Sequence, residues 1–360
     1  MFEYKFFSIQ GLSFELLNTP EDKEYLVRFL DGSTTIYETR LRKGMWAKPS
    51  RRYLSNYYVE IIDIESGDVL EKISFLERLK GNKVFISFES KSLGDAISWI
   101  PYCLKFKETY KCDVVVSTFQ NFLFEQVYPE LTFVGRGEVV HNIVGMFEVG
   151  WFYNKEMEPV NPATIPLQRA ATNILHLPYH EIQPRIHHVP KERPTDQKYV
   201  AISVRSTSQC KHWPDQYWQE LVDKLNEMGY GVYEISKDPC DLKGLLPTPD
   251  RSLEGAMNII HHAEFVIGLS SGLSWLAWGM GKKVVMIANF TEKDHEFTSN
   301  CIRITNESVC HGCWNNPKFK FDKGNWWWCP EHEGTDRQFE CHKKITAEDV
   351  LQKIQPLLSE

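Results

Sequence analysis

The C-terminal half of the chain alternates short, nearly all-apolar segments with segments of helical character. The apolar segments are residues 199–204 (YVAISV), 231–236 (GVYEIS), 264–269 (EFVIGL) and 283–289 (KVVMIAN). Runs of this length and composition are typical of strands that are buried on both faces of a sheet. Helical segments follow the first three, so this half predicts an α/β domain with a parallel sheet, and residues 301–306 are a further candidate strand.

A second unit of the same kind precedes it. Residues 83–88 (KVFISF) and 112–117 (CDVVVS) are the predicted strands, and a helix is expected to open near Asp95 between them. The polar segment 187–198 carries two prolines and breaks the pattern, which indicates a linker between the two units. Ligands of such sheets bind outside the carboxyl ends of the strands, so we expect the working cleft between the facing strand ends.

Residues 1–80 have the alternating pattern of antiparallel strands instead. Two pairs of such runs flank Asp31-Gly32 and Ser66-Gly67, and both dipeptides are hairpin signals. We therefore predict three parts: an N-terminal β domain at residues 1–80, a Rossmann-like domain at residues 81–190, and a second Rossmann-like domain at residues 191–360.

Bulk properties argue against several functions. The net charge of −7 gives no reason to expect binding of nucleic acid. No run approaches the ~20 apolar residues of a membrane span, and the first residues lack the basic start and apolar run of a secretory signal. We therefore expect no membrane span and a cytoplasmic location, where the odd number of nine cysteines fits reduced thiols better than disulfides.

The loop after the first α/β strand holds the sequence Ser92-Leu93-Gly94-Asp95. Gly94 permits a tight turn, and Asp95 stands at the expected start of a helix that faces the cleft. An aspartate at this place has two interpretations. It caps the helix N-terminus, which is its more frequent role, or it acts as a general base on an acceptor hydroxyl.

A second loop, residues 205–214, joins a predicted buried strand to the next helix. Ser206, Thr207 and Ser208 offer hydroxyl groups, and Lys211 offers a positive charge close to the helix N-terminus. Together they would suit a diphosphate group, although a solvated loop that only caps the helix explains the same residues. The loop lacks the glycines of a Walker A motif, so ATP hydrolysis is not indicated.

A third loop, residues 268–275 (GLSSGLSW), leads into another helix. The backbone N–H groups around Ser271 and Gly272 would make a second anion site, because the glycine lets a ligand approach closely. The letters GLSSG also match the G-x-S-x-G pattern of hydrolases, with Ser270 as the nucleophile. A hydrolase needs a histidine and an acid downstream, and His295 is a weak candidate, so we disfavour that interpretation.

Four of the nine cysteines lie within residues 310–341 with the spacing C-x2-C-x15-C-x11-C: Cys310, Cys313, Cys329 and Cys341. Four thiolates at these spacings can close a tetrahedral metal site, and a closed shell favours a structural role over a catalytic one. Zinc is the general expectation for such a site, and a disulfide pairing is disfavoured in a reducing compartment. The nearby histidines are then surplus ligands, and we predict that they are surface residues: His311, His332 and His342.

The three loops together resemble those of the ADP-heptose-dependent glycosyltransferases of lipopolysaccharide synthesis. The matching motifs are SLGD at residues 92–95, KHWP at residues 211–214 and SGLSW at residues 271–275. The cysteine segment, with CHGCWNNP and WCPEH, resembles the iron finger of the bacterial autotransporter heptosyltransferases, which add heptose to serine hydroxyls of autotransporter adhesins. The resemblance covers nearly the whole chain, including its β-rich N-terminal part.

This resemblance implies an α/β fold of the GT-B glycosyltransferase type, with two Rossmann-like domains, an extra N-terminal β domain and a four-cysteine metal finger at residues 310–341. It assigns the acceptor side to residues 81–190 and the nucleotide sugar to residues 191–360. A cytoplasmic enzyme is implied, with ADP-heptose as donor, an autotransporter adhesin protein as acceptor and a large homo-oligomer as its assembly. The resemblance also favours one structural ferric iron per subunit, held by the four thiolates, with zinc as the alternative.

Roles for single residues come from the same resemblance. Asp95 becomes the general base of an inverting displacement, and Lys211 becomes the contact of the donor diphosphate. The further donor-binding residues are Ser92, Leu93, Gly94, Ser206, Thr207, Ser208, Ser271, Gly272 and Leu273, with Glu234 and Ile235 where the adenosine is usually held. No metal is needed for the transfer itself, because fixed cationic and dipolar groups stabilise the leaving ADP. One departure concerns the sugar: the lipopolysaccharide enzymes have Asp and His around the third loop, where this chain has Ser270 and Trp275.

Two other functions remain open at this stage. The chain would be a glycosyltransferase that uses another nucleotide sugar, or a non-catalytic metal-finger scaffold in adhesin biogenesis. The scaffold predicts no sugar transfer and no dependence on Asp95.

Overall fold

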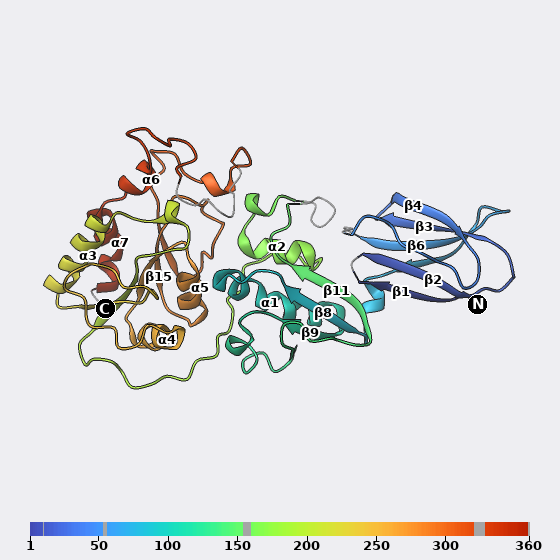
Figure 1. The fold of residues 1–360 in the computed structure, drawn as a ribbon, viewed down its shortest axis with the longest axis horizontal. Helices are drawn as coiled ribbons and strands as arrows, with labels where there is room; N and C mark the ends of the chain where they lie inside the picture. The colour runs from blue at the N-terminus through green and yellow to red at the C-terminus, as the bar shows by residue number, and fades with distance from the viewer. Residues whose placement is uncertain (10, 53–55, 154–159, 320–327, 359–360) are drawn as a thin grey trace.

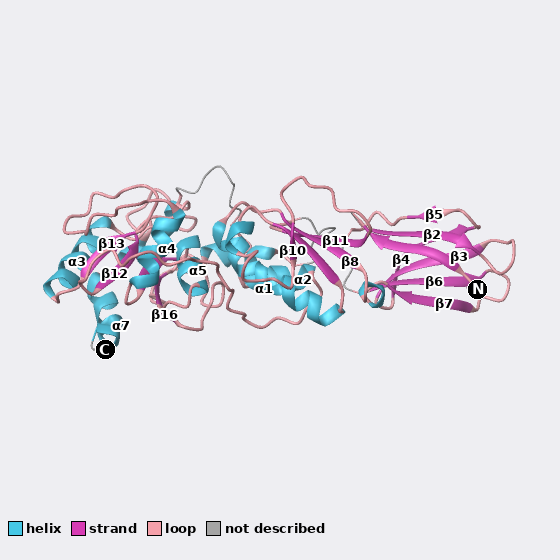
Figure 2. Cartoon of the chain, turned by 90° about the horizontal axis from the view of Figure 1, so that it is seen from below, coloured by secondary structure: helices cyan, strands magenta, loops and turns pink. Residues whose placement is uncertain are grey.

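The structure of this chain is a computed structural model that describes residues 1–358 apart from residues 10, 53–55, 154–159 and 320–327. The molecule is elongated, with β-sheets at its N-terminal end, one α/β unit in the middle and a second α/β unit at the other end (Figure 1). Strands dominate the N-terminal end, whereas helices accompany the sheets of the two α/β units (Figure 2). None of the described helices is both long and apolar enough to cross a membrane.

Four antiparallel strands form a separate sheet near the N-terminus. They are β3 (Tyr25–Asp31), β4 (Thr34–Leu41), β6 (Tyr57–Asp63) and β7 (Val69–Ser74), in the order β4-β3-β6-β7. β3 and β4 are joined through the pair Asp31↔Thr34 next to their turn, and β6 and β7 pair in the same antiparallel way. Both predicted hairpins are therefore confirmed.

The other N-terminal strands belong to a different sheet. β1 (Glu3–Ser8), β2 (Leu12–Asn18) and β5 (Trp46–Ala47) extend a seven-stranded sheet of order β10-β9-β8-β11-β1-β2-β5. β1 joins β11 (Ile143–Val149) in parallel through the pair Ser8↔Gly145. The sheet thus continues across residue 80, and the proposed division of the chain into three domains stays a prediction.

The middle α/β unit follows the predicted alternation. Its strands β8 (Lys83–Phe88), β9 (Asp113–Ser117), β10 (Thr132–Phe133) and β11 pair in parallel, and its helices are α1 (Leu93–Tyr110) and α2 (Leu167–Ile174). The predicted strands at residues 83–88 and 112–117 and the helix between them are confirmed. β11 lies in a stretch whose pattern did not indicate a strand.

The C-terminal unit is built on five parallel strands in the order β13-β12-β14-β15-β16. They are β12 (Tyr199–Ser203), β13 (Gly231–Glu234), β14 (Val266–Leu269), β15 (Val284–Ile287) and β16 (Cys301–Ile304). Each of the apolar segments that the sequence analysis assigned to this sheet contains one of these strands. The parallel α/β prediction is therefore confirmed for this half, including the last candidate strand.

Helices α3 (Asp215–Glu227), α4 (Leu253–His262) and α5 (Gly272–Gly279) separate the strands of this unit, and α6 (Glu340–Lys343) and α7 (Ala347–Leu358) close the chain. α7 begins with reciprocal hydrogen bonds. Asp349 N donates to Thr346 Oγ1 (3.2 Å), and Thr346 N donates to Asp349 Oδ2 (2.7 Å). This arrangement satisfies backbone N–H groups that a helix start leaves without a partner.

The two α/β units meet at the N-termini of α1 and α5. A Cβ atom on Gly94 would lie 3.3 Å from Gly272 Cα, and one on Gly272 would lie 3.1 Å from the backbone nitrogen of Gly94. Both glycines therefore permit a close approach between the units that a larger residue would strain. The contact brings the loop after β8 and the loop after β14 to one place.

Candidate active site

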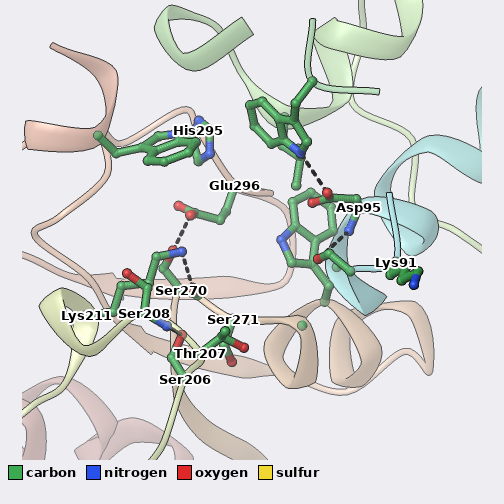
Figure 3. A pocket seen from close by; sticks show the side chains of 17 residues that line it. Lys91, Asp95, Ser206, Thr207, Ser208, Lys211, Ser270, Ser271, His295 and Glu296 are labelled. Carbon is green, nitrogen blue, oxygen red and sulfur yellow. Dashed lines mark hydrogen bonds between the residues drawn. The ribbon is translucent and has the colours of Figure 1, made fainter. Parts of the chain in front are cut away.

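A cavity of about 490 Å³ lies where the N-termini of α1 and α5 meet. Both α/β units contribute to its wall, and the cysteine-rich segment adds Trp314. Figure 3 shows Asp95 on one side of this cavity and Lys211, Ser270 and Glu296 on the other. The site thus has acidic and basic groups from different parts of the chain facing one cavity.

All three predicted loops reach this cavity. The residues that line it are Ser92, Gly94 and Asp95 from the first loop, Ser206, Thr207, Ser208 and Lys211 from the second, and Ser271 and Gly272 from the third. Two predicted donor-binding residues of the same loops do not line it. Leu93 and Leu273 lie in the first turns of α1 and α5 and pack against the hydrophobic core.

Glu234 and Ile235, predicted near the adenosine, lie at the end of β13 and also do not line the cavity. The carboxylate of Glu234 is buried and accepts hydrogen bonds from Ser236 N (2.7 Å) and Arg251 Nη1 (2.7 Å). Ile235 is buried in the core. Contact of these two residues with adenosine stays a prediction.

Asp95 lies in the first turn of α1, but it does not cap the helix. Ser92 is the N-cap residue, and its Oγ accepts a hydrogen bond from Asp95 N (3.5 Å). The capping interpretation of Asp95 is therefore wrong, because the helix starts three residues earlier than that interpretation required. The Asp95 carboxylate is held at Oδ2 by Ser90 Oγ (2.6 Å) and Trp151 Nε1 (2.7 Å). Both of these hydrogen bonds reach the same oxygen, and the Asp95 side chain lines the cavity.

The surroundings of Asp95 act on its pKa in two directions. Burial raises the pKa above its usual value, because a buried site disfavours the charged form. Hydrogen bonds from Ser90, Trp151 and Ser92 and the charge of Lys211 oppose this rise. A buried carboxylate with a raised pKa that lines a cavity has the properties of a general base.

Lys211 stands across the cavity at the end of a short 3-10 turn, Gln209–Lys211. Its Nζ donates a hydrogen bond to the backbone oxygen of Ser270 (2.9 Å), which ties the second loop to the third. The centre of the Phe290 ring lies 5.9 Å from the same nitrogen. An ammonium group near the N-terminus of α5 makes a site suited to an anion such as a diphosphate.

Glu296 is a residue of this cavity that the sequence analysis missed. Its buried carboxylate accepts hydrogen bonds from Ser270 Oγ, Thr291 Oγ1 (3.0 Å) and Arg303 Nη1 (2.6 Å). Although burial opposes the effect, the charge of Arg303 lowers the pKa of Glu296 to about 2, with contributions from His295 and Lys211. The cavity therefore has a carboxylate beside Ser270 that is ionised at neutral pH. No sequence motif pointed to Glu296, because it lies 26 positions after Ser270, its partner in the third loop.

The hydroxyl of Ser270 donates to this carboxylate and not to a histidine. His295 is buried, and its Nδ1 lies 3.2 Å from Ile165 O and 3.1 Å from Asn315 Nδ2. Burial lowers the pKa of His295, which favours the neutral ring. No hydrogen bond within the described part of the chain joins Ser270 to His295, so the disfavoured hydrolase interpretation gains no support.

The four cysteines of the predicted metal finger are all described, although residues 320–327 of the finger lie outside the described part. Cys313, Cys329 and Cys341 are buried, and Cys310 is half-buried. Burial and the charges of Cys310 and Cys329 raise the pKa of Cys313 to about 12, and burial and the other three thiols raise the pKa of Cys341. A bound cation would relieve this mutual repulsion of thiolates. No three of the four thiols, however, belong to a group of ligand atoms within 4.8 Å of one another in the described part of the chain, so the four-cysteine site stays a prediction.

A second set of ligand atoms overlaps this cluster. Atoms of Cys310, His332 and Glu340 lie within 4.8 Å of one another, and His332 Nε2 is 3.5 Å from Glu340 Oε1. The prediction of surface histidines is confirmed for exposed His311 but is wrong for His342, which is 1 % exposed. His342 is buried because α6 packs inward, where Asn289 Nδ2 donates to the backbone oxygen of Cys341 (3.0 Å).

Known proteins resemble this chain in sequence over nearly all of it. Residues 167–325 match Glycosyltransferase family 9 (heptosyltransferase). The autotransporter heptosyltransferase Aah of Escherichia coli is 33% identical over 338 residues, which cover 88% of this chain and 84% of Aah. The inactive autotransporter heptosyltransferase BimC of Burkholderia thailandensis is 28% identical over 354 residues, which cover 93% of this chain and 82% of BimC.

The likeness extends to a solved structure. The crystal structure of TibC, an iron-containing dodecameric glycosyltransferase from enterotoxigenic E. coli, matches with a TM-score of 0.84 at 29% identity and covers 99% of this chain and 95% of TibC. TibC in complex with ADP-D-beta-D-heptose matches with a TM-score of 0.83. The architecture described above is therefore that of an α/β glycosyltransferase.

Proposed function

This chain belongs to the autotransporter heptosyltransferases and is a glycosyltransferase, and from that premise we propose that it transfers heptose from ADP-glycero-manno-heptose to serine hydroxyls of an autotransporter adhesin. One observation carries the proposal: Asp95 and Lys211, from different α/β units, line the same cavity. Sugar transfer from a nucleotide needs a base for the acceptor and a positive group for the leaving diphosphate. The ADP-heptose complex of TibC supports this choice of donor.

In this proposal the donor diphosphate binds between the second and third loops. Lys211 and the hydroxyls of Ser206, Thr207 and Ser208 line one wall, and Ser271 and Gly272 at the start of α5 line the other. The ammonium group and the N–H groups of the helix N-terminus stabilise the negative charge that grows on ADP as it leaves. The transfer step then needs no divalent cation.

The sugar and the nucleoside occupy the two ends of the donor site. Glu296 offers a charged acceptor to a heptose hydroxyl, because Arg303 holds its carboxylate in place and ionised. The adenosine lies toward the carboxyl end of β13, where Glu234 and Ile235 stand. Ser92 and Gly94 complete the donor site from the start of α1, and a donor contact of Leu93 stays a prediction.

Asp95 acts on the acceptor. A serine hydroxyl attacks the anomeric carbon from the face opposite to ADP, so one displacement inverts the configuration. The Asp95 carboxylate takes the proton while the C–O bond forms. Because the hydroxyl becomes acidic only late in this step, a carboxylate base suffices.

The cysteine cluster completes the proposal as a structural metal site. We assign it one iron held by Cys310, Cys313, Cys329 and Cys341, with zinc as the alternative, and the iron in TibC supports this assignment. When bound, the metal would cross-link the two halves of the finger with a closed shell of thiolates. His332 and Glu340 stand beside Cys310 and would form the surroundings of that shell.

A homo-oligomer is part of the same proposal, supported by the dodecameric assembly of TibC. A cytoplasmic location and the lack of nucleic-acid binding stay predictions from the sequence.

BimC is an inactive heptosyltransferase by its name, which supports a function without catalysis. The alternative is therefore a non-catalytic scaffold for adhesin biogenesis. The two functions differ in their dependence on Asp95. A third candidate, transfer of another nucleotide-linked sugar, depends on Asp95 in the same way and differs only in the donor.

The test incubates the purified protein with ADP-heptose and a serine-rich autotransporter passenger, and mass spectrometry follows the passenger. A heptose-sized mass gain that Asp95→Asn abolishes and exposed Asp196→Asn retains is the expected result. No mass gain with wild-type protein would refute the transferase and favour the scaffold. A gain only with other nucleotide sugars would refute the choice of donor.

A further inference from the structure

Two tryptophans from distant parts of the chain meet in the wall of the cavity. Trp151 follows β11 of the middle unit, and Trp314 lies in the 3-10 turn Cys313–Asn315 of the cysteine finger. Their ring centroids are 5.5 Å apart with the planes at 86°, an edge-to-face contact. Trp151 is the residue whose Nε1 donates to Oδ2 of Asp95 (2.7 Å). Trp151 therefore contacts both the cysteine finger, through Trp314, and the carboxylate of Asp95.

Trp314 is held in place by its own backbone and by the two residues that flank it, Cys313 and Asn315. Its backbone N donates to Phe290 O (3.0 Å), and Cys313 packs against Phe290 in a small buried cluster. On the other side, Asn315 Nδ2 donates to Ala163 O (2.7 Å), and Asn315 Oδ1 accepts from Glu292 N (2.9 Å). The turn that carries Trp314 is thus attached to the middle unit and to the C-terminal unit.

Trp151 lies between two other indole rings. Trp99, buried in α1, is 6.3 Å from it on the core side, and Trp314 contacts it from the finger side. A hydrogen bond weakens steeply when the donor turns away from its acceptor. Removing one of these two rings would let the Trp151 indole rotate and would misalign the N–H group that holds Asp95.

We propose that Trp314 is a positioning residue for Asp95, which it serves by holding the Trp151 indole in its hydrogen-bonding orientation. This inference rests on the proposed role of Asp95 in sugar transfer. It gives the cysteine finger a share in the reaction beyond the local stabilisation expected of a closed metal site. The finger supplies the ring that keeps the base aligned, although its thiolates take no part in the chemistry.

The experiment compares Trp314→Leu with Trp314→Phe, which keeps an aromatic ring. Trp328→Leu is the matched control, because Trp328 belongs to the same finger but does not line the cavity, and its ring packs 6.4 Å from that of Phe319. The loss of one aromatic pair predicts a roughly 2- to 10-fold fall in kcat/KM for Trp314→Leu. In the pH–rate profile of Trp314→Leu, the acidic limb, where kcat/KM falls as Asp95 becomes protonated, should move to higher pH. The affinity for ADP, measured by calorimetry, should stay unchanged. In Trp314→Phe and Trp328→Leu, the acidic limb of the pH–rate profile should lie at the same pH as in wild type.

A second measurement needs no enzymatic activity. The Trp151 indole N–H resonance, assigned by its loss in Trp151→Phe, should exchange faster with solvent in Trp314→Leu and not in Trp328→Leu, because a misaligned N–H group loses its hydrogen bond to Asp95. A double variant gives a further kinetic test. When Trp151→Phe is already present, adding Trp314→Leu should not move the acidic limb of the pH–rate profile any further, because Trp314 acts on Asp95 through Trp151.

The outcomes separate this inference from the proposed function. Two results for Trp314→Leu would overturn the positioning role. One is a Trp151 N–H resonance and an acidic limb of the pH–rate profile that both match wild type. The other is a loss of ADP affinity without movement of the acidic limb. Wild-type protein that transfers no heptose would refute the proposed function, whereas the resonance would still decide whether Trp314 orients Trp151.

Discussion

Replacing Trp151 by phenylalanine tests how the cavity prepares its base. The change keeps a ring between Trp99 and Trp314 but removes the Nε1–H group that donates to Asp95 over 2.7 Å. That hydrogen bond favours the charged carboxylate and opposes the effect of burial on the pKa of Asp95. Its loss should therefore raise the pKa further.

The sign of the effect on the rate follows from the role of a base. A base works in its deprotonated form, so kcat/KM falls as the pH drops below its pKa. A higher pKa moves this acidic limb to higher pH. Where Asp95 is ionised in both proteins, the two profiles should approach each other.

The magnitude follows from the burial of Asp95, which is 7% exposed, so screening by solvent is small. A hydrogen bond to a charged group contributes about 1.5–3 kcal/mol. Since about 1.36 kcal/mol corresponds to a tenfold change, kcat/KM on the acidic limb should fall by roughly 10- to 150-fold.

The assay measures heptose transfer to a passenger peptide as a function of pH for wild type, Trp151→Phe and Trp46→Phe. Trp46 is 65% exposed in β5 and serves as the control for a tryptophan-to-phenylalanine change outside the cavity. Calorimetry with ADP confirms that each variant is folded and binds the nucleotide. Superimposable pH profiles of Trp151→Phe and wild type would show that this hydrogen bond does not tune the base, and would refute the reasoning.

Four further changes test the rest of the site. Asp95→Asn keeps the shape of the side chain but removes the base, and should lower kcat by about 100-fold or more while calorimetry still detects ADP binding; a retained kcat would contradict the assignment. Lys211→Met removes the ammonium group and should weaken ADP binding by about 1.5–3 kcal/mol, whereas equal affinities would exclude a diphosphate contact. Glu296→Gln leaves the charge of Arg303 without its partner and should lower the free energy of unfolding in urea by about 3–5 kcal/mol; in wild type the stability due to this carboxylate is present above its usual pKa of 4.5 and is lost as the pH falls toward about 2. Cys313→Ser should abolish the visible absorption of a ferric–thiolate centre, and a colourless wild-type protein with bound metal would indicate zinc instead.

Most strands and helices could be predicted because their signals are local. The C-terminal strands are short apolar runs, and composition alone marks such runs as buried between helices. The assignment failed where that signal is missing, as in β11, and where pairing is not sequential. β1 pairs with β11 through Ser8↔Gly145, a contact that no local pattern in residues 1–80 reveals.

The candidate site was predicted in part for a related reason. Loops at the carboxyl ends of parallel strands converge, so Asp95, Lys211 and Gly272 could be placed near one another from the order of elements alone. Glu296 and Trp151 carry no motif, and their contacts with the three loops reach Ser270 across 26 positions and Asp95 across 56 positions. The capping interpretation of Asp95 was wrong because Ser92 already fills that position.

The sequence by itself determined the α/β alternation, the three loops, the cysteine spacing and the family, since each depends on residue types and on their order along the chain. Tertiary structure alone decided which side chains act on Asp95. Trp151 reaches Asp95 across 56 positions, and Trp314 reaches Trp151 from the cysteine finger. Alignment and pKa depend on burial and on hydrogen bonds from the groups that fold around a carboxylate, and these are contacts that a linear pattern does not contain.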